Sequence, residues 1–250
     1  MPNYCDNTLV IVSPKNVWDN TLEKLLFVDY KDSEEKTPTY HRRFSFGALL
    51  PQPEELINTT APANVVSQEE YDEWYAEWLQ IPEDDFRKNF GRKITEEMSN
   101  DLISKYGFNN WYDWRYSKWG VKWDADVYNI DVEEKKDRSG VDIVEATINF
   151  TTPWSPAEFW FSTLCDNIRG FGVFMEMRFA EEGMGFAGTQ YFDNDEQWEA
   201  DGEIYQVDDA TGDKVNYDDE LCKWRNESGK FVSEDSVRSE ILYDINDLGG

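Results

Sequence analysis

The sequence is poor in histidine, cysteine and long apolar runs, and each shortage excludes a class of site. A single histidine in 250 residues excludes a metal site built on several imidazoles. The three cysteines form no CxxC pair and are odd in number, so we expect free buried thiols and no disulfide framework. No stretch approaches 18 consecutive apolar residues, so we expect no membrane span. The N-terminal residues lack the features of a signal peptide, which favours a cytoplasmic protein.

Basic residues are also scarce. The chain has 24 lysines and arginines against 52 acidic residues, a net charge of −28. Such a field repels phosphate, so we expect no direct binding to nucleic acid or to membranes, and attraction to a basic partner. The charge is uneven, because residues 181–220 hold fourteen acids and one base, Lys214. A second acidic stretch, 69–85, contains no base.

Motifs that would identify a reaction are missing. The glycines of residues 183–188 lie in a predicted hairpin and do not open a helix, so they form no phosphate loop. Residues 193–195 begin like a calcium loop, but the required glycine and final glutamate do not follow. Carboxylates are abundant, yet nothing selects a catalytic pair. We therefore expect no enzyme, no cofactor and no dedicated metal site, and the sequence leaves the oligomeric state open.

Hydrophobic periodicity predicts one compact α+β domain with a C-terminal appendage. Ser67 and Glu70 have the spacing of a capping box, and the helix after them would carry Tyr71, Trp74 and two further aromatics on one face. Aromatic content of 16% is enough for a real core. In chain order we expect strands at 8–12, 44–46, 125–132, 141–151, 171–180, 185–192 and near 204–205 and 231–232, helices at 16–26, 67–81, 95–106, 155–169 and 234–242, and a turn at 31–39.

Five segments, in order, carry a resemblance to a family. They are Pro2–Ile11 (PNYCDNTLVI), Leu50–Leu56 (LPQPEEL), the tryptophan-rich run Asn109–Ala125, Thr152–Pro156 (TPWSP) and Glu182–Gly188 (EGMGFAG). Together they resemble the YubB-like, ferredoxin-like family of bacteriophage and conjugative-plasmid proteins.

The resemblance implies a ferredoxin-like α/β sandwich, with helices on one face of an antiparallel sheet, in a mobile genetic element. It implies no established activity. On this basis we expect a domain at 1–192 with a helical, Trp-rich insertion at about 60–124, and an acidic C-terminal extension at 193–250 packed on the same domain. The sequence departs from the family pattern at four positions. Tyr4 and Ser13 stand where the pattern has Trp and Gly, and Lys118 and Val121 stand where it has Asn and Thr.

The tryptophan-rich run has two interpretations. Its rings could form a platform on which a small ligand or a nucleotide-derived signal stacks, with the basic side chains and Asp124 for orientation. Alternatively, the rings could cover one end of the sheet, in an irregular segment whose polar groups satisfy the indole N–H groups. The candidate ligand-binding residues are Trp111, Trp114, Arg115, Trp119, Lys122 and Trp123.

The acidic surface is the first functional candidate. An array of carboxylates could replace phosphate as the partner of arginines and lysines in a basic host protein that handles nucleic acid. In a phage or plasmid, such a DNA mimic would act as an inhibitor in counter-defence, in the cytoplasm of the bacterial host. The competing interpretation is an acidic surface that serves solubility or adaptation to high salt. The candidate contact residues are Glu181, Glu182, Asp193, Asp195, Glu196, Glu199, Asp201, Asp208 and Asp209, followed by Glu69, Glu70, Asp72 and Glu73.

Overall fold

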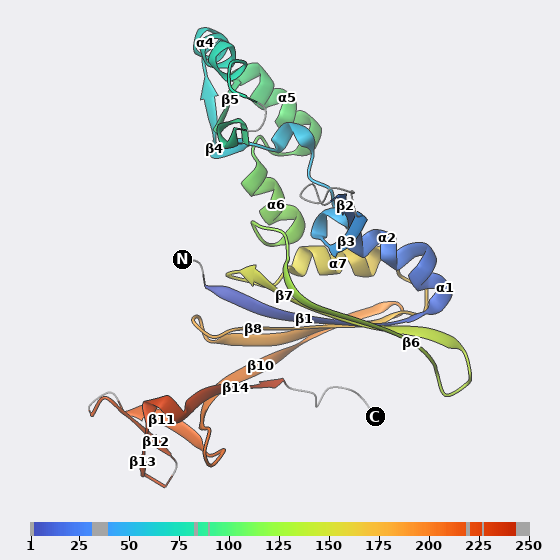
Figure 1. The fold of residues 1–250 in the computed structure, drawn as a ribbon, viewed down its shortest axis with the longest axis vertical. Coiled ribbons are helices and arrows are strands. Elements are labelled where there is room, and N and C mark those ends of the chain that lie inside the picture. The colour runs from blue at the N-terminus through green and yellow to red at the C-terminus, as the bar shows by residue number, and fades with distance from the viewer. Residues whose placement is uncertain are drawn as a thin grey trace. The chain divides into compact units, whose positions relative to one another are not determined.

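A computed structural model of the chain describes residues 3–31, 40–82, 85–89, 91–218, 221–226 and 228–243 (Figure 1). Most of the predicted turn at 31–39, and the ends of the two acidic stretches at 83–84 and 219–220, lie outside the described residues. Contacts divide the chain into two compact units. The sheet unit comprises Met1–Asp19, Asp126–Pro156 and Cys165–Gly250, and the helical unit comprises Asn20–Ala125 and Ala157–Leu164.

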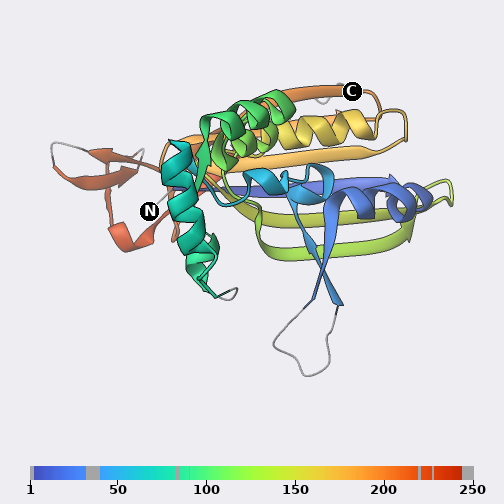
Figure 2. The same ribbon diagram turned by 90° about the horizontal axis from the view of Figure 1, so that it is seen from above.

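The sheet unit is built on one long antiparallel sheet. Its strand order is β13-β12-β11-β10-β9-β8-β1-β7-β6, with β14 also paired to β10. Figure 2 shows β1, β7 and β6 side by side, as their pairing requires. The strands are β1 (Tyr4–Pro14), β6 (Asp126–Lys136), β7 (Asp142–Pro153), β8 (Phe174–Glu181), β9 (Phe186–Asp193), β10 (Glu196–Asp208), β11 (Lys214–Asp218), β12 (Lys223–Asn226), β13 (Phe231–Val232) and β14 (Val237–Tyr243).

Alternation along the strands explains which face of this sheet is buried. Leu9 and Ile11 on β1 are fully buried, as are Ile148 and Phe150 on β7, whereas the residues between them are partly exposed. Successive side chains of a strand point to opposite faces, so these four residues share one face. Four strands lie in the order β8-β1-β7-β6. When residues 27–125 are left out, the chain path through them is strand, helix, strand, strand, helix, strand. This path is that of the ferredoxin-like motif.

Most predicted strands of this unit are confirmed, but the C-terminal helix is wrong. The hairpin predicted at 171–180 and 185–192 is β8 and β9. Residues Val237–Tyr243 form a strand after a single 3-10 turn, Glu234–Ser236. In the register of this strand, Ile241 lies opposite Ile204 of β10 and Val237 lies opposite Asp208. Pairing with β10 therefore outweighs the local helical pattern.

Two helices connect these strands to the helical unit. The predicted helix at 16–26 is helical from Lys15 onward, but it contains a π-helical turn. The second helix begins at Glu158, three residues after the predicted cap. The elements are α1 (Lys15–Val17), the π turn η1 (Trp18–Leu22), α2 (Glu23–Leu26) and α7 (Glu158–Asn167).

The helical unit combines short helices with two strand pairs. The β2–β3 hairpin is antiparallel and the β4–β5 pair is parallel. The elements are β2 (Phe27–Lys31), β3 (Tyr40–Phe44), α3 (Phe46–Leu49), η2 (Glu54–Leu56), β4 (Thr59–Val66), α4 (Gln68–Trp78), η3 (Phe86–Asn89), β5 (Arg92–Thr95), α5 (Glu96–Tyr106) and α6 (Trp111–Trp119).

Capping residues determine where these helices lie. The capping box of Ser67 and Glu70 is present at the start of α4. Asn110 caps α6 by accepting a hydrogen bond from the backbone N–H of Asp113 at 2.9 Å, and Gly120 ends α6 with a φ of 87°. The tryptophan-rich run is therefore helical over residues 111–119, and the irregular segment of its second interpretation is limited to the residues outside this helix.

The strand predicted at 44–46 is also corrected. Phe44 ends β3, while Ser45 caps α3 by accepting from the backbone N–H of Gly47 at 3.1 Å. Phe44, Phe46 and Trp119 then form an aromatic core with Trp160, whose ring centroid lies 5.4 Å from that of Phe44 and 5.0 Å from that of Phe46. None of the helices in the described part of the chain is long and apolar enough to cross a membrane.

Candidate ligand-binding site

The tryptophan-rich helix divides its side chains between a core and a cavity. Trp114 and Trp119 are buried, and the indole N–H of Trp119 donates to the carbonyl oxygen of Leu50 at 3.0 Å. Trp111 and Arg115 instead line a cavity of about 530 Å³, together with Trp123 from the segment after the helix. We call it the Arg115 cavity. Its lining residues are Gln52, Ile57, Asn58, Thr59, Thr60, Ala61, Asn89, Gly91, Trp111, Arg115 and Trp123.

Two hydrogen bonds fix the guanidinium of Arg115. Nε donates to Oε1 of Gln52 at 2.6 Å, and a terminal nitrogen donates to the backbone oxygen of Lys122 at 3.3 Å. The guanidinium carbon also lies 5.3 Å from the ring centroid of Trp111 and 5.0 Å from that of Trp119. Burial lowers the pKa of Arg115, yet an arginine keeps its charge at neutral pH. The side chain is a cation held in a set direction.

Gln52 adds a second donor to the same wall. Because the Arg115 Nε–H can only donate, the amide oxygen of Gln52 must face it. The amide nitrogen of Gln52 is then a buried donor without an acceptor among the described residues. A buried donor of this kind costs free energy until an acceptor occupies the site.

The tryptophans of the cavity are anchored through their backbone or through a neighbour. The backbone N–H of Trp111 donates to Oγ1 of Thr59 in β4 at 2.9 Å. Trp123 has 41% of its side chain exposed, and the ammonium of Lys122 lies 4.2 Å from its ring centroid. Lys122 thus contacts Trp123 without lining the cavity. Three of the six candidates from the run meet in this cavity, and Trp114 and Trp119 belong to the core.

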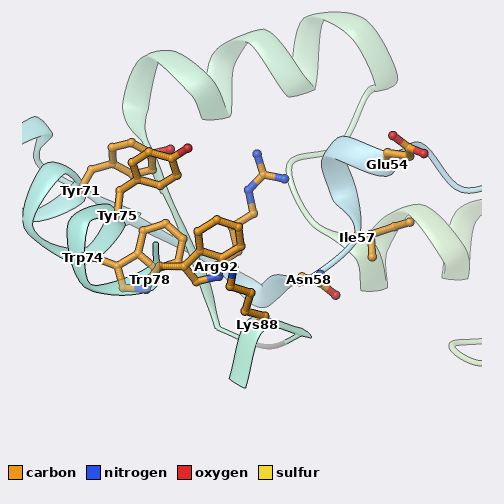
Figure 3. A pocket seen from close by; sticks show the side chains of 9 residues that line it. All are labelled: Glu54, Ile57, Asn58, Tyr71, Trp74, Tyr75, Trp78, Lys88 and Arg92. Atoms are coloured by element: carbon orange, nitrogen blue, oxygen red, sulfur yellow. The ribbon is translucent and has the colours of Figure 1, made fainter. Parts of the chain in front are cut away.

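A second cavity, of about 500 Å³, opens beside α4 (Figure 3). We call it the α4 cavity. The rings of Tyr71 and Tyr75 are nearly parallel, with centroids 5.8 Å apart, and Tyr75 and Trp78 repeat that spacing. The ammonium of Lys88 lies 4.4 Å from the ring centroid of Trp78. The lining residues are Glu54, Ile57, Asn58, Tyr71, Trp74, Tyr75, Trp78, Lys88 and Arg92.

Sequence reasoning placed the aromatics of α4 on one face but did not identify them as a site. The signal was available, because four aromatics at spacings of three and four residues stand beside a run of acids. Such a stripe usually indicates a core-facing helix. In the structure no residue of α4 is buried, so the stripe faces a cavity.

Two of the acidic candidates are corrected, because their side chains are buried. Glu181 is 2% exposed, and its carboxylate accepts hydrogen bonds from the backbone N–H groups of Gly183 and Met184 in the β8–β9 turn. Asp208 is 8% exposed and accepts from the backbone N–H of Ala210 at 3.2 Å. Both carboxylates accept backbone hydrogen bonds within turns, and their burial keeps them from contacting a partner protein.

The other acidic candidates are exposed, although some are engaged locally. Glu199 accepts from the amide of Gln190 at 2.9 Å, and Asp209 forms an ion pair with Arg238 at 2.7 Å. Glu70 is occupied in the capping box of α4. The exposed candidates are Glu182, Asp193, Asp195, Glu196, Glu199, Asp201 and Asp209 in the sheet unit, and Glu69, Glu70, Asp72 and Glu73 on α4.

The negative charge is concentrated in the sheet unit. By sequence that unit holds 31 acidic and 11 basic residues, whereas the helical unit holds 21 and 13. The net charge is therefore −20 for the sheet unit and −8 for the helical unit. Among the described residues that line the Arg115 cavity, Arg115 is the only charged one. An anionic group in this cavity meets no carboxylate in the described lining.

Within the described residues, no group of three or more histidine, cysteine, aspartate or glutamate side chains could hold an ion. Cys5 and Cys165 are free thiols and are buried, as predicted. Burial raises the pKa of each of these two thiols to about 12. Cys222 is exposed, so the expectation that all three are buried is wrong.

Comparison with known proteins finds a family match for part of the chain. A family model described as the ferredoxin-like domain in Api92-like protein matches residues 122–220. The crystal structure of the protein api92 from Yersinia pseudotuberculosis is 11% identical, with a TM-score of 0.34, over 78% of this chain and 95% of that one. No curated protein matches.

The family-model match supports the ferredoxin-like part of the expected resemblance. The comparisons name neither the YubB-like family nor a phage or plasmid, so those parts stay expectations. The matched span runs from the residues just before β6 to the end of β11, within which the strands are antiparallel. Residues 122–220 of this α+β chain are similar to the ferredoxin-like domain of Api92-like proteins.

Proposed function

We propose that this protein is a non-enzymatic binding protein for a small ligand that combines a flat unsaturated ring with an anionic group. The observation that carries the proposal is the fixed guanidinium of Arg115 between Trp111 and Gln52, at the wall of a cavity of about 530 Å³. Pockets for small molecules are commonly about 300–1,000 Å³ and apolar, with a few placed polar groups. The Arg115 cavity has that composition.

The ligand class follows from what the wall offers. A flat ring stacks on tryptophan, and such stacking contributes roughly 1–3 kcal/mol per nucleobase. Arg115 uses two of its five N–H groups in the hydrogen bonds to Gln52 and Lys122. The remaining donors, with the amide nitrogen of Gln52, suit phosphate or carboxylate oxygens. A nucleotide carries both the ring and the anion, which favours a nucleotide or a nucleotide-derived signal.

The overall charge is compatible with such a ligand. A net charge of −28 would repel an anion from most of the surface, but 20 of these net charges belong to the sheet unit. The helical unit, which contains the cavity, has a net charge of only −8. Among the described residues that line the cavity, Arg115 is the only charged one, so the charge that an anion meets in that lining is positive.

A fluorescence titration tests this proposal. Adenosine 5′-monophosphate should quench tryptophan emission saturably in the wild-type protein, because Trp111 and Trp123 line the site. Trp123→Leu should weaken binding at least tenfold, whereas Trp154→Leu should leave it unchanged. Trp154 is a fair control because it is similarly exposed, at 44%, and lies in the sheet unit. Equal affinities of wild type and Trp123→Leu would refute the proposal.

A second candidate function uses the acidic surface of the sheet unit. Seven of the nine acidic candidates between residues 181 and 209 are exposed, and the region 181–220 has a single base in its sequence. Carboxylates in this density could occupy the nucleic-acid channel of a basic host protein. The resemblance to proteins of mobile elements favours an inhibitor of host defence. We also interpret residues 60–124 as a helical insertion and 193–250 as an acidic extension, since β10 to β14 continue the sheet.

Charge reversal tests the second candidate. Changing Asp195, Glu196, Glu199 and Asp201 to lysine should abolish salt-sensitive competition with duplex DNA for a basic DNA-binding protein. Reversing Asp131 and Glu133, which are exposed acids on β6, is the control for a non-specific effect of charge. If both sets of reversals weaken competition equally, the acidic surface provides only net charge.

A further inference from the structure

We propose that the α4 cavity is a second ring-binding site of the same ligand, which then has two flat rings joined by an anionic linker, the chemistry of a dinucleotide. This inference rests on the proposed function of the Arg115 cavity. It identifies the class of ligand more closely, because a single ring would occupy one cavity of about 530 Å³ and leave the other, of about 500 Å³, unused.

The two cavities share a wall. Ile57 and Asn58 line both of them. Sequence neighbours also divide between them, because Lys88 and Arg92 line the α4 cavity while Asn89 and Gly91 line the Arg115 cavity. A ligand that fills both would cross the wall at Ile57 and Asn58.

Hydrogen bonds and strand pairing link residues that line the α4 cavity to residues that line the Arg115 cavity. The backbone N–H of Arg92 donates to the carbonyl oxygen of Asn58 at 3.0 Å, and Arg92 is paired with Thr59 where β4 meets β5. Oγ1 of Thr59 accepts from the backbone N–H of Trp111 at 2.9 Å. One strand pair therefore positions Arg92 for the α4 cavity and Trp111 for the Arg115 cavity.

The α4 cavity offers a stacking surface that nothing in the described part of the chain buries. Tyr71, Tyr75 and Trp78 form a ladder of nearly parallel rings, and Tyr75 is 42% exposed. Exposed clusters of large aromatic side chains usually mark a binding site. Figure 3 shows this ladder beside Arg92 and Lys88.

The charges of the α4 cavity select an anionic partner for the rings. Among the described residues, Lys88, Arg92 and one carboxylate, Glu54, line it. The acids Glu69, Asp72 and Glu73 are exposed on α4 and do not line the cavity. Arg115 lines the neighbouring cavity, so each of the two cavities that share this wall has at least one cation in its lining. The linker between two rings would lie there, so the cations favour a phosphate linker over a neutral one.

Calorimetric titration of the full chain tests this inference with two matched probes, adenosine 5′-monophosphate and the 5′-phosphorylated dinucleotide pApA. The dinucleotide should bind at least tenfold more tightly than the mononucleotide. Tyr75→Leu should remove that advantage and leave the affinity of the Arg115 cavity for the mononucleotide unchanged. Tyr116→Leu is the control, because Tyr116 is 49% exposed and lines neither cavity.

A second pair of variants tests the cations. Arg92→Gln should weaken pApA about tenfold, whereas Lys93→Gln, which removes a neighbouring charge outside the lining, should change it little. Equal affinities of the two probes, or an unchanged affinity of Tyr75→Leu for pApA, would overturn the inference. If the mononucleotide still requires Trp123 in that case, the proposed function survives. If neither probe binds, both proposals fall.

Discussion

Arg115 and Gln52 are 63 residues apart in the sequence, and a hydrogen bond of 2.6 Å joins Nε of the arginine to Oε1 of the glutamine. This bond sets the direction of the guanidinium and leaves the amide nitrogen of Gln52 as an unpaired buried donor. The arginine comes from α6, and the glutamine comes from the segment before η2. The candidate site therefore depends on how two distant segments of the helical unit pack.

The first prediction concerns this bond. Gln52→Ala should weaken nucleotide binding roughly tenfold while the charge of Arg115 is retained, because a hydrogen bond to a charged group contributes about 1.5–3 kcal/mol. Gln80→Ala is the control, since Gln80 is exposed and lines neither cavity. Calorimetry with adenosine 5′-monophosphate measures both. If the two variants bind alike, Gln52 has no part in the site.

The second prediction separates core tryptophans from cavity tryptophans. Trp119→Ala should lower the free energy of unfolding by about 3–5 kcal/mol, because its buried ring packs on Phe46 and its N–H bonds to Leu50. Trp123→Ala should cost less than about 1 kcal/mol, as the ring is 41% exposed. Urea unfolding of the two variants checks this, and a large loss from Trp123→Ala would place that ring in the core.

The third prediction compares two adjacent glutamates. Glu181→Gln should lower the free energy of unfolding by roughly 1–3 kcal/mol, since the amide cannot accept from both Gly183 and Met184 as the carboxylate does. Glu182→Gln should stay within about 0.5 kcal/mol, because that side chain is exposed. Both changes remove one negative charge, so thermal unfolding of the pair separates the turn contact from net charge. Equal effects would contradict the assigned role of Glu181.

The fourth prediction concerns alkaline pH. In the folded protein the pKa values of Cys5 and Cys165 are about 12, above the value of about 8.5 for an unfolded thiol. The folded state therefore favours the protonated thiol. The contribution of each buried thiol to the free energy of unfolding is complete below about pH 8.5. It is lost as pH rises toward 12, by about 1.4 kcal/mol per pH unit for each thiol.

Replacing both buried cysteines with alanine should flatten the fall of unfolding free energy between pH 8.5 and 10. Cys222→Ala, at an exposed position, is the control and should not change that slope. Chemical denaturation at a series of pH values measures the slopes. A wild-type slope that equals that of the double variant would show that the thiols are not desolvated.

The parts of the fold that follow local rules could be predicted from the sequence. The capping-box spacing of Ser67 and Glu70 predicted α4, and the alternation of apolar and polar residues predicted β7, β8 and β9. The parallel pairing of β4 with β5 could not be read, because it joins segments that flank α4 and leaves no local pattern. The helix in the tryptophan-rich run could have been predicted, because Asn110 and Gly120 are residue types that commonly cap the two ends of a helix.

The candidate site could be predicted only in part. Residue types alone identified Arg115 and the tryptophans as a stacking set, but they did not separate Trp111 from Trp114. That separation depends on contacts with Leu50, Gln52 and Thr59, all more than 50 residues earlier in the chain. Likewise, composition could not show that the carboxylate of Glu181 accepts a backbone hydrogen bond within the β8–β9 turn.

The most direct measurement is a calorimetric titration of adenosine 5′-monophosphate into wild type, Arg115→Met and Lys118→Met. Both variants lose one positive charge from α6, but only Arg115 lines the cavity. We expect wild type and Lys118→Met to bind alike, and Arg115→Met to bind at least tenfold more weakly. Equal binding by all three proteins, or no binding by wild type, would contradict the proposal that this protein binds a ring-bearing anion in the Arg115 cavity.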